Sequence, residues 1–416
     1  MQKIRKMAFP QVNHCMILGG SLAGLMHAHT VLSHSPSTNV TILERSPTAL
    51  LHNQGAGVVA GSETQKFFEK YVRPQRDIAV TSQERLYLDK QGGIVDGSVD
   101  KRQQRMTSWD LLYRFLRWRA DGMPIEEYFD STPPENDGPK AEYLNGCIVS
   151  NVKNLGQSRG VQVTWKDKSG AEQSAEADLV IAADGGSSTI RRLLKPEVQR
   201  TYVGYLAFRG TVPETELSDA ATKVFSEKFA FYHTQGTQVL AYLIPGENGS
   251  LERGQRLMNW VWYVNFEDGS PELEELMTDT DGKRHAITLP PGGMKKSVWE
   301  EQVKLAKDVL PPQYAELVQK TKQPFIQAIT DVVSDENLFM DGKVILVGDA
   351  LAGFRPHTAA STSQAAFDAL TLGEWMQGQI KRDEYRQRCL SYAHEVQRHG
   401  VMLGERSQFG RHPFAS

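Results

Sequence analysis

The 416-residue sequence predicts an α/β protein: a Rossmann-like nucleotide-binding domain assembled from discontinuous segments, with a mostly antiparallel β-sheet inserted and a helical C-terminal region. Three observations predict this fold. Residues 15–34 change from a short apolar run to a glycine-rich turn and then a helical pattern. Similar strand–turn–helix patterns recur at residues 179–194 and 344–376, and residues 202–266 alternate as strands do.

The first unit carries the loop "MILGGSLAGL", with Gly19, Ser21 and Gly24 where dinucleotide-binding loops usually have three glycines. In such loops the glycines allow a tight turn, close approach to a pyrophosphate and close helix packing. Ser21 is small, can cap the helix and can offer its hydroxyl to a phosphate. Glu44 ends the next strand, 20 residues after Gly24, where an acid can accept hydrogen bonds from ribose hydroxyls. The loop alone would fit a plain turn, but the whole unit predicts nucleotide binding.

Further elements follow in order. Residues 84–97 predict a β-hairpin, residues 106–120 a helix, and residues 121–140 a loop. The stretches "CIVSNVKNL" and "GVQVTWKDKSGAEQ" predict a small antiparallel meander, and residues 202–266 predict a second antiparallel sheet. A charged helical stretch is expected over residues 298–320.

The segment "ADGGSSTIRRLL" predicts a strand end, a turn and a helix that stops before Pro196. Asp184 ends the strand, and Ser187 or Ser188 can cap the helix. Arg191 lies in the first helical turn, where a cation opposes the helix dipole. This placement indicates either a nearby anion such as a pyrophosphate or a surface salt bridge.

The third segment, "VILVGDALAGFRPHTAAST", predicts a buried strand, a loop and a helix that starts near Ser361. The Asp349 carboxylate at the strand tip can hold a sugar-like polyol, or the segment can be a simple break between strand and helix. Pro356 fixes the loop, and the helix N-terminus is the positive end of a dipole.

Composition excludes several classes of function. With 47 basic and 50 acidic residues the formal charge is −3, which gives no general attraction to nucleic acid or an anionic membrane. We find no apolar run long enough for a membrane span. The three separate cysteines fit a reduced protein, so we expect a cytoplasmic location.

The domain organisation follows from these patterns. We expect residues 12–70, 104–198 and 325–390 in the nucleotide-binding domain, residues 71–103 and 199–324 in a substrate-binding β-sheet domain, and residues 391–416 in a C-terminal helical tail.

Taken together, "GGSLAGL" with Glu44, "ADGGSSTIR" and "VGDALAGFRPH" resemble, in this order, the motifs of single-component (class A) FAD-dependent aromatic hydroxylases, the group of para-hydroxybenzoate hydroxylase. The resemblance covers nearly the whole chain. The stretches "GGS", "TSWDLLYRFLR", "AFRG", "NWVWY" and "RPH" make it most similar to dihydroxypyridine hydroxylase-like members.

The resemblance implies FAD as the cofactor and gives roles to matching residues. The AMP half of FAD is assigned to Gly19, Ser21, Gly24 and Glu44. Contacts to FAD and NAD(P)H are assigned to Asp184 and Arg191, and the ribityl chain to Asp349. The flavin ring is assigned to Gly57 in "QGAGVV", Pro356, Ser361 and Thr362.

The sequence departs from the group at two positions. Ser108 stands where many members have an arginine that binds the pyrophosphate, so Arg105 is the candidate replacement. Gly353 stands where many have a histidine, and His357 follows four residues later.

The implied reaction is a monooxygenation. NADPH or NADH binds transiently and reduces FAD, and molecular oxygen forms a hydroperoxide at flavin C4a. One oxygen atom then reaches an electron-rich aromatic or N-heteroaromatic small molecule. Alternatives are a flavoenzyme of the same fold that performs epoxidation, oxidative decarboxylation or rearrangement, a flavin reductase or oxidase that produces peroxide, and a binding or regulatory protein with a disabled site. The predicted partners are this small molecule and oxygen, and a homodimer is one assembly that the sequence allows without determining the oligomeric state.

Three residues are candidates for chemistry at the substrate. His357 and His233 can accept a proton, although a lone histidine is more often structural. Arg209 can hold a phenolate or a carboxylate, or form a salt bridge at a sheet edge. Aromatic residues of the second sheet are expected to exclude water from the site: Tyr205, Phe208, Tyr232, Tyr242, Trp260 and Trp262.

Overall fold

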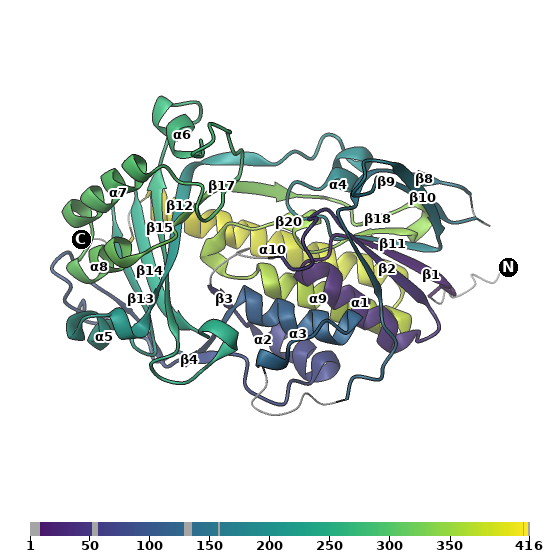
Figure 1. Cartoon of the computed structure of the whole chain (residues 1–416), viewed down its shortest axis with the longest axis horizontal. Helices are drawn as coiled ribbons and strands as arrows, with labels where there is room; N and C mark the ends of the chain where they lie inside the picture. Colours follow the sequence, from purple (N-terminus) through teal and green to yellow (C-terminus); the bar gives the residue numbers. More distant parts are fainter. Residues whose placement is uncertain (1–8, 52–56, 129–134, 157–158, 411, 415–416) are drawn as a thin grey trace.

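A computed structural model describes residues 9–51, 57–128, 135–156, 159–410 and 412–414. Figure 1 shows two large sheets toward opposite ends of the long axis of the molecule, with α9 (Ser361–Met376) and α10 (Arg382–Gln408) between them. The described residues contain no helix with the length and apolar character needed to cross a membrane.

The first large sheet is the nucleotide-binding type that the sequence predicts. Its strand order is β18-β19-β11-β1-β2-β7, and its members pair in parallel except for β18. The strands are β1 (His14–Leu18), β2 (Asn39–Glu44), β7 (Glu142–Asn145), β11 (Leu179–Ala182), β18 (Leu338–Phe339) and β19 (Val344–Leu346). Buried apolar residues such as Ile17 and Ile181 make the central strands β1, β11 and β19 continuous hydrophobic runs, as expected for the part of a sheet that is covered on both faces.

Helices cover one side of this sheet, and a small meander lies near the other. The helices are α1 (Leu22–His34), α2 (Ser62–Phe67), the π-helix η1 (Phe68–Val72), α3 (Trp109–Asp121) and α9, with α4 (Thr189–Leu194) after β11. The meander, β8 (Ile148–Asn154), β9 (Val161–Lys166) and β10 (Glu172–Ala177), confirms the prediction. A second small sheet joins β3 (Gly57–Val59), β6 (Gln104–Ser108) and β4 (Val80–Ser82).

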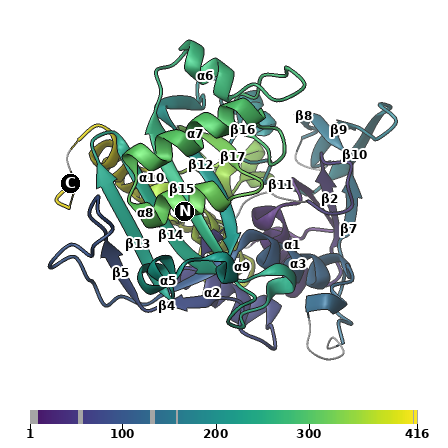
Figure 2. The same ribbon diagram turned by 60° about the vertical axis from the view of Figure 1, so that its left-hand side comes forward.

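The second large sheet has the order β16-β17-β12-β15-β14-β13-β5, with β20 paired to β17. It is mostly antiparallel, and the predicted sheet over residues 202–266 forms its centre. The strands are β5 (Glu84–Tyr87), β12 (Thr201–Pro213), β13 (Lys228–Thr234), β14 (Thr237–Ile244), β15 (Leu257–Asn265), β16 (Thr288–Leu289), β17 (Phe325–Val333) and β20 (Ala352–Gly353). Figure 2 shows α7 (Lys296–Val309) and α8 (Pro312–Lys320) over one face of this sheet.

Short helices complete the described fold: α5 (Asp219–Phe225), α6 (Pro271–Leu276) and the 3-10 turns η2 (Glu126–Tyr128), η3 (Glu214–Glu216), η4 (Glu247–Gly249), η5 (Met340–Gly342), η6 (Gly348–Ala350) and η7 (Pro356–Thr358).

Several local predictions differ from the structure. The helical stretch over residues 298–320 is two helices, because Pro311 and Pro312 interrupt the helical hydrogen bonds between α7 and α8. The first arm of the hairpin at residues 84–97 is β5, which pairs in parallel with β13, whereas the second arm returns only through isolated bridges such as Leu88 to Ile94. Residues 325–333, expected in the nucleotide-binding domain, form β17 of the second sheet, and the expected boundary after residue 390 falls inside α10.

Candidate active site

The glycine loop connects β1 to α1 at the carboxyl end of the parallel sheet. Gly19 has φ +104°, and a Cβ there would lie 2.3 Å from the Ala183 carbonyl oxygen. A Cβ on Gly24 would lie 1.9 Å from the Gly19 carbonyl oxygen. Both glycines are therefore required by close backbone contacts, as the sequence predicts. Ser21 is the N-cap of α1, but its side chain makes no capping hydrogen bond, so its hydroxyl remains accessible to a ligand.

Glu44 ends β2 beside this loop. Its carboxylate accepts hydrogen bonds from the backbone amides of Gly20 and Ser46, at 2.8 Å each. The side chain is buried and has no ion pair among the described residues, so its remaining lone pairs can accept hydroxyl donors. The Tyr143 hydroxyl donates to the Gly20 carbonyl at 2.9 Å. Tyr143 lies on β7, a strand that we did not predict, because its four half-exposed residues lack a strong pattern.

The second predicted segment forms the turn between β11 and α4. Asp184 accepts hydrogen bonds from the backbone amides of Thr189 and Ile190, so it stabilises the start of α4. Ser188 is the N-cap, as predicted, and accepts a bond from the Arg191 amide at 2.9 Å.

Arg191 connects the second segment to the third. Its side chain is buried, and one Nη donates to the Ala350 carbonyl at 2.8 Å and the other to the Gly186 carbonyl at 2.5 Å. These partners exclude the surface salt bridge considered above. The Arg191 Nε has no hydrogen-bond partner among the described residues. Arg191 therefore brings a buried positive charge to the junction of the two segments.

The third segment places Asp349 just after β19. The Asp349 carboxylate is accessible from the pocket that it faces. Desolvation by the pocket walls raises the pKa of Asp349, and the positive charges of Arg200 and Arg191 oppose this rise. Arg200, which the sequence did not identify, donates from Nε to Thr330 Oγ1 at 2.6 Å. The preceding Gly348 has φ +55°, and a Cβ there would lie 2.8 Å from the Cβ of Ala23 in α1. All three segments therefore converge.

The pocket has a volume of about 300 Å³ and lies between the loops of the first sheet and one face of the second. Its lining includes eight of the candidate catalytic and cofactor-binding residues predicted from the sequence: Gly57, Arg209, His233, Asp349, Pro356, His357, Ser361 and Thr362. Gly57 donates its amide to Asn259 Oδ1 at 3.0 Å, and a Cβ there would lie 2.5 Å from Tyr242. Residues 54–56 of the "QGAGVV" segment lie outside the described residues.

A chain of hydrogen bonds connects both candidate histidines. His357 Nε2 lies 2.9 Å from the Tyr205 hydroxyl, and His357 Nδ1 lies 2.8 Å from Gln238 Oε1. Because the amide oxygen only accepts, Nδ1 carries the proton, and Nε2 accepts from Tyr205. The Gln238 Nε2 donates in turn to His233 Nε2 at 3.1 Å. Burial lowers the pKa of His357 to about 3 and that of His233 well below its usual value, so both imidazoles are neutral at pH 7.

Arg209 extends from β12 into the pocket. Its guanidinium donates to Gln327 Oε1 at 3.2 Å and to the Gly57 carbonyl at 3.4 Å, and its Nε is buried without a partner. Arg209 forms no ion pair with any residue that the structure describes. Among these residues, the alternative of a salt bridge at a sheet edge is therefore excluded. The uncompensated positive charge of Arg209 suits an anionic or carbonyl-bearing ligand.

Among the described residues, the predicted replacement arginine has its ion pair and side-chain hydrogen bonds with Asp77 and Thr81 and not with the glycine loop. Arg105 lies on β6, where it pairs with Asp77 and donates to Thr81 Oγ1 at 3.0 Å. Its neighbour Gln104 lines the pocket, because successive residues of a strand face opposite sides. Ser108 accepts a hydrogen bond from the Leu111 amide at 3.2 Å and so caps α3. None of these contacts directs Arg105 toward the Gly19 turn.

Four of the six aromatic residues that we expected to exclude water from the site lie on the other face of the second sheet. Tyr205 and Tyr242 belong to the apolar cluster on the pocket face of the second sheet. The other four residues, Phe208, Tyr232, Trp260 and Trp262, belong to the cluster on the opposite face, which packs against α5, α7 and α8. The error arises because sequence alternation separates the two faces of a strand without telling which face a ligand meets.

Comparisons with known proteins agree with this geometry. A family profile described as FAD binding domain-like matches residues 202–331. The chain is 30% identical over 366 residues to 2,6-dihydroxypyridine 3-monooxygenase of Paenarthrobacter nicotinovorans, covering 88% of this chain and 83% of that protein. It is 23% identical to 6-hydroxynicotinate 3-monooxygenase of Pseudomonas fluorescens, covering 86% and 80%.

Solved structures have the same fold. The 2,6-dihydroxypyridine-3-hydroxylase of Arthrobacter nicotinovorans superposes with a TM-score of 0.79 at 27% identity, covering 98% of this chain and 97% of that one. A salicylate hydroxylase substrate complex superposes with a TM-score of 0.64 at 17% identity, covering 96% and 90%.

Fold and site define an FAD-dependent monooxygenase, an oxidoreductase. The glycine cradle, the unpaired Glu44 carboxylate and the accessible Asp349 fit the phosphate, ribose and ribityl groups of FAD. The chain belongs to the class A FAD-dependent aromatic hydroxylases and is similar to their dihydroxypyridine hydroxylase members.

Proposed function

We propose that the protein hydroxylates an electron-rich aromatic or N-heteroaromatic small molecule, with NADPH or NADH as the reductant. The proposal rests on one pocket, whose lining combines the Asp349 and Pro356 loops with the polar groups of Arg209 and His357. The named activities of the two relatives, on a dihydroxypyridine and a hydroxynicotinate, support a small hydroxylated ring.

FAD would be held by Gly19, Ser21, Gly24, Glu44, Gly57, Asp184, Arg191, Asp349, Pro356, Ser361 and Thr362. When bound, FAD would supply the redox chemistry, namely reduction by the nicotinamide and activation of oxygen for transfer to the ring. Arg105 is proposed here only as a residue that supports the β4–β6 sheet, because its side chain is paired with Asp77.

The remaining chemistry belongs to the pocket residues. Arg209 stabilises the ionised form of a substrate oxygen. The negative charge on this oxygen makes the ring more electron-rich. His357 Nε2 has one lone pair, which accepts from the Tyr205 hydroxyl, so His357 can take the proton of a substrate hydroxyl only when Tyr205 turns away. Because burial lowers the pKa of His357 to about 3, its neutral imidazole orients the Tyr205 hydroxyl and holds no second ring proton at pH 7. Tyr242 and Tyr263 shield this region from bulk water.

A screen of aromatic compounds tests the proposal. A substrate should accelerate NAD(P)H oxidation by the holoenzyme and yield a product one oxygen atom heavier by mass spectrometry. Acceleration with peroxide as the sole product would instead identify the oxidase alternative. Loss of carbon dioxide or a rearranged skeleton would identify the alternative reactions of the same fold.

Location and assembly complete the proposal. The three cysteines are free and buried, which supports the reducing cytoplasm. Cell fractionation tests that location, and the elution volume in size-exclusion chromatography tests the homodimer.

A further inference from the structure

The pocket continues past the proposed reaction site to the free edge of the second sheet. Arg85 and Tyr87 on the edge strand β5 line this end, together with Arg406 of α10 and His412 of the C-terminal segment. We call these four residues the edge cluster. Asp349, at the opposite end, is the only carboxylate among the described lining residues.

The Arg85 guanidinium is held in place by aromatic and amide groups, and no carboxylate among the described residues forms an ion pair with it. Its guanidinium lies over the rings of Phe229 and Phe231, at 5.3 and 5.2 Å, and donates from Nη2 to Gln104 Oε1 at 3.0 Å. Its Nε is buried without a partner among the described residues. The nearby Asp100 exchanges backbone hydrogen bonds with Arg85, but no ion pair within 4 Å joins their side chains. The surrounding groups therefore orient Arg85 without neutralising it.

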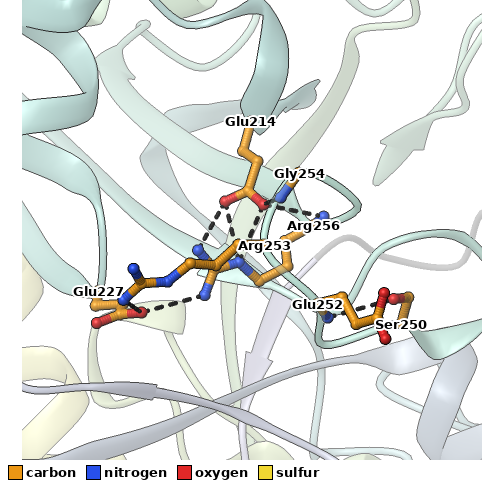
Figure 3. Close-up of polar contacts among 7 residues, drawn as sticks. All are labelled: Glu214, Glu227, Ser250, Glu252, Arg253, Gly254 and Arg256. Atoms are coloured by element: carbon orange, nitrogen blue, oxygen red, sulfur yellow. Dashed lines mark hydrogen bonds and ion pairs between the residues drawn. The ribbon is translucent and has the colours of Figure 1, made fainter.

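Some buried arginines outside the pocket, such as Arg256 and Arg355, are neutralised by carboxylates, whereas Arg191 beside the proposed cofactor site is held, among the described residues, only by carbonyl groups. Figure 3 shows Arg256 with its Nε and Nη2 on both oxygens of Glu214 and its Nη1 toward Glu227. Arg355 likewise pairs with Asp331 and Glu405, at 2.6 and 2.8 Å. Burying a charge without a counter-ion is costly, so an unpaired arginine in a pocket indicates an anionic ligand.

The rest of the edge cluster fits the same ligand. Arg406 has no ion pair among the described residues. The His412 ring stacks on His233 with centroids 3.9 Å apart and on Tyr87 at 5.1 Å. Burial, together with Arg406, lowers the pKa of His412 to about 4, so this ring is an uncharged aromatic wall at pH 7. The positive charge of the cluster comes from its two arginines.

We propose that the substrate is an aromatic acid whose carboxylate binds between Arg85 and Arg406, an inference that rests on the proposed function. The proposed reaction site lies farther along the pocket, at Arg209 and at His357, which contacts Gln238 of β14. Strand β13 separates β14 from β5, so their axes are roughly 10 Å apart. The carboxylate is therefore carried on a short side chain or a second ring, not on the oxygenated ring itself.

Binding of matched compounds tests this inference. The probes are a hydroxyphenylacetate, a hydroxyphenylpropanoate and a hydroxycinnamate, each with its methyl ester. Dissociation constants come from the change in flavin absorbance of the holoenzyme, with thermal stabilisation as a second measurement. The variants are Arg85→Met, Arg406→Met and the charge-retaining Arg85→Lys. Arg253→Met, whose side chain is 79% exposed and paired with Glu227, is the matched control.

We expect at least one acid to bind wild-type holoenzyme about tenfold more tightly than its ester. Both methionine variants should remove this preference, whereas Arg85→Lys should keep part of it and Arg253→Met all of it. Arg406 is exposed, so its variant tests the inference even if Arg85→Met does not fold.

Equal binding of every acid and its ester overturns the inference, as does a preference that survives both methionine variants. A raised KM for NAD(P)H with unchanged acid binding also overturns it, because the arginines would then serve the phosphates of the nicotinamide nucleotide. Failure of the proposed function itself is distinct: no aromatic compound, charged or uncharged, would gain an oxygen atom.

Discussion

The two large sheets deliver their functional residues in different ways. In the parallel sheet, Glu44, Asp184 and Asp349 each follow the carboxyl end of a strand, so three distant segments meet at one edge. In the antiparallel sheet, Arg209 and Gln238 lie within strands and reach the pocket because alternate residues share one face. The parallel sheet thus offers strand ends to a cofactor, whereas the antiparallel sheet offers a face to a substrate.

The largest expected effect tests the opposite face of the antiparallel sheet. Trp260→Ala should lower the free energy of unfolding by about 3–5 kcal/mol, because Trp260 is fully buried and its Nε1 donates to Thr321 Oγ1 at 2.8 Å. Denaturant unfolding measures this loss, with Trp260→Phe as the milder control. A loss below about 1 kcal/mol would contradict the assignment of this face to the core.

Glu44→Ala tests the strand ends. Removal of the carboxylate leaves the Gly20 and Ser46 amides without their acceptor and takes away the proposed ribose ligand. We expect FAD to bind about a hundredfold more weakly, because the proposed charge-assisted hydrogen bonds from the two ribose hydroxyls to Glu44 are lost. Equilibrium dialysis of the apoprotein with FAD measures the change. Unchanged affinity would remove Glu44 from the cofactor site.

Arg209→Met tests the pocket face of the same antiparallel sheet. Loss of one charged contact should lower kcat/KM for the aromatic substrate by about tenfold or more. FAD affinity should remain at the wild-type value, in contrast to Glu44→Ala. Arg209→Lys, which keeps the charge, should recover part of the activity. If the variant instead lost FAD, the assignment of cofactor binding to the parallel sheet and substrate binding to the antiparallel sheet would be contradicted.

His357→Ala should lower the yield of oxygenated product per NAD(P)H oxidised by severalfold, with peroxide making up the difference. The reason is the lost acceptor of the Tyr205 hydroxyl. Because the pKa of His357 is about 3, wild-type coupling should show no titration of this residue between pH 5 and pH 8. Full coupling in the variant would assign the proton transfer to another group.

The smallest effect concerns Asp368 of α9, which accepts a bond from the Gly348 amide at 2.9 Å just before the Asp349 strand end. Burial raises the pKa of Asp368 to about 7. Between about pH 4 and pH 7 the folded protein therefore binds more protons at this site than the unfolded chain, so its contribution to stability falls as pH rises. Asp368→Asn should remove this fall and raise Tm at pH 8, relative to pH 5, by about 2 °C or more.

The control for this comparison is Asp335→Asn. Asp335 is exposed and its pKa is lowered by Lys195, so its contribution to stability does not fall over that range. An Asp368→Asn variant whose Tm follows the wild-type pH dependence would show that the carboxyl is not protonated in the folded protein.

The sequence by itself determined the strand–turn–helix units and the residues at their turns. Gly19, Gly24, Glu44 and Asp349 could be identified because local backbone geometry fixes which residue types fit a turn or a strand end. Only the tertiary structure decided which partners these residues meet. Arg105 pairs with Asp77, Arg191 binds carbonyl groups of two loops, and Trp260 faces away from the pocket. Arg85, Arg406 and His412 come together only through sheet order and the path of α10, and contacts between such distant positions leave no periodic signal in the sequence.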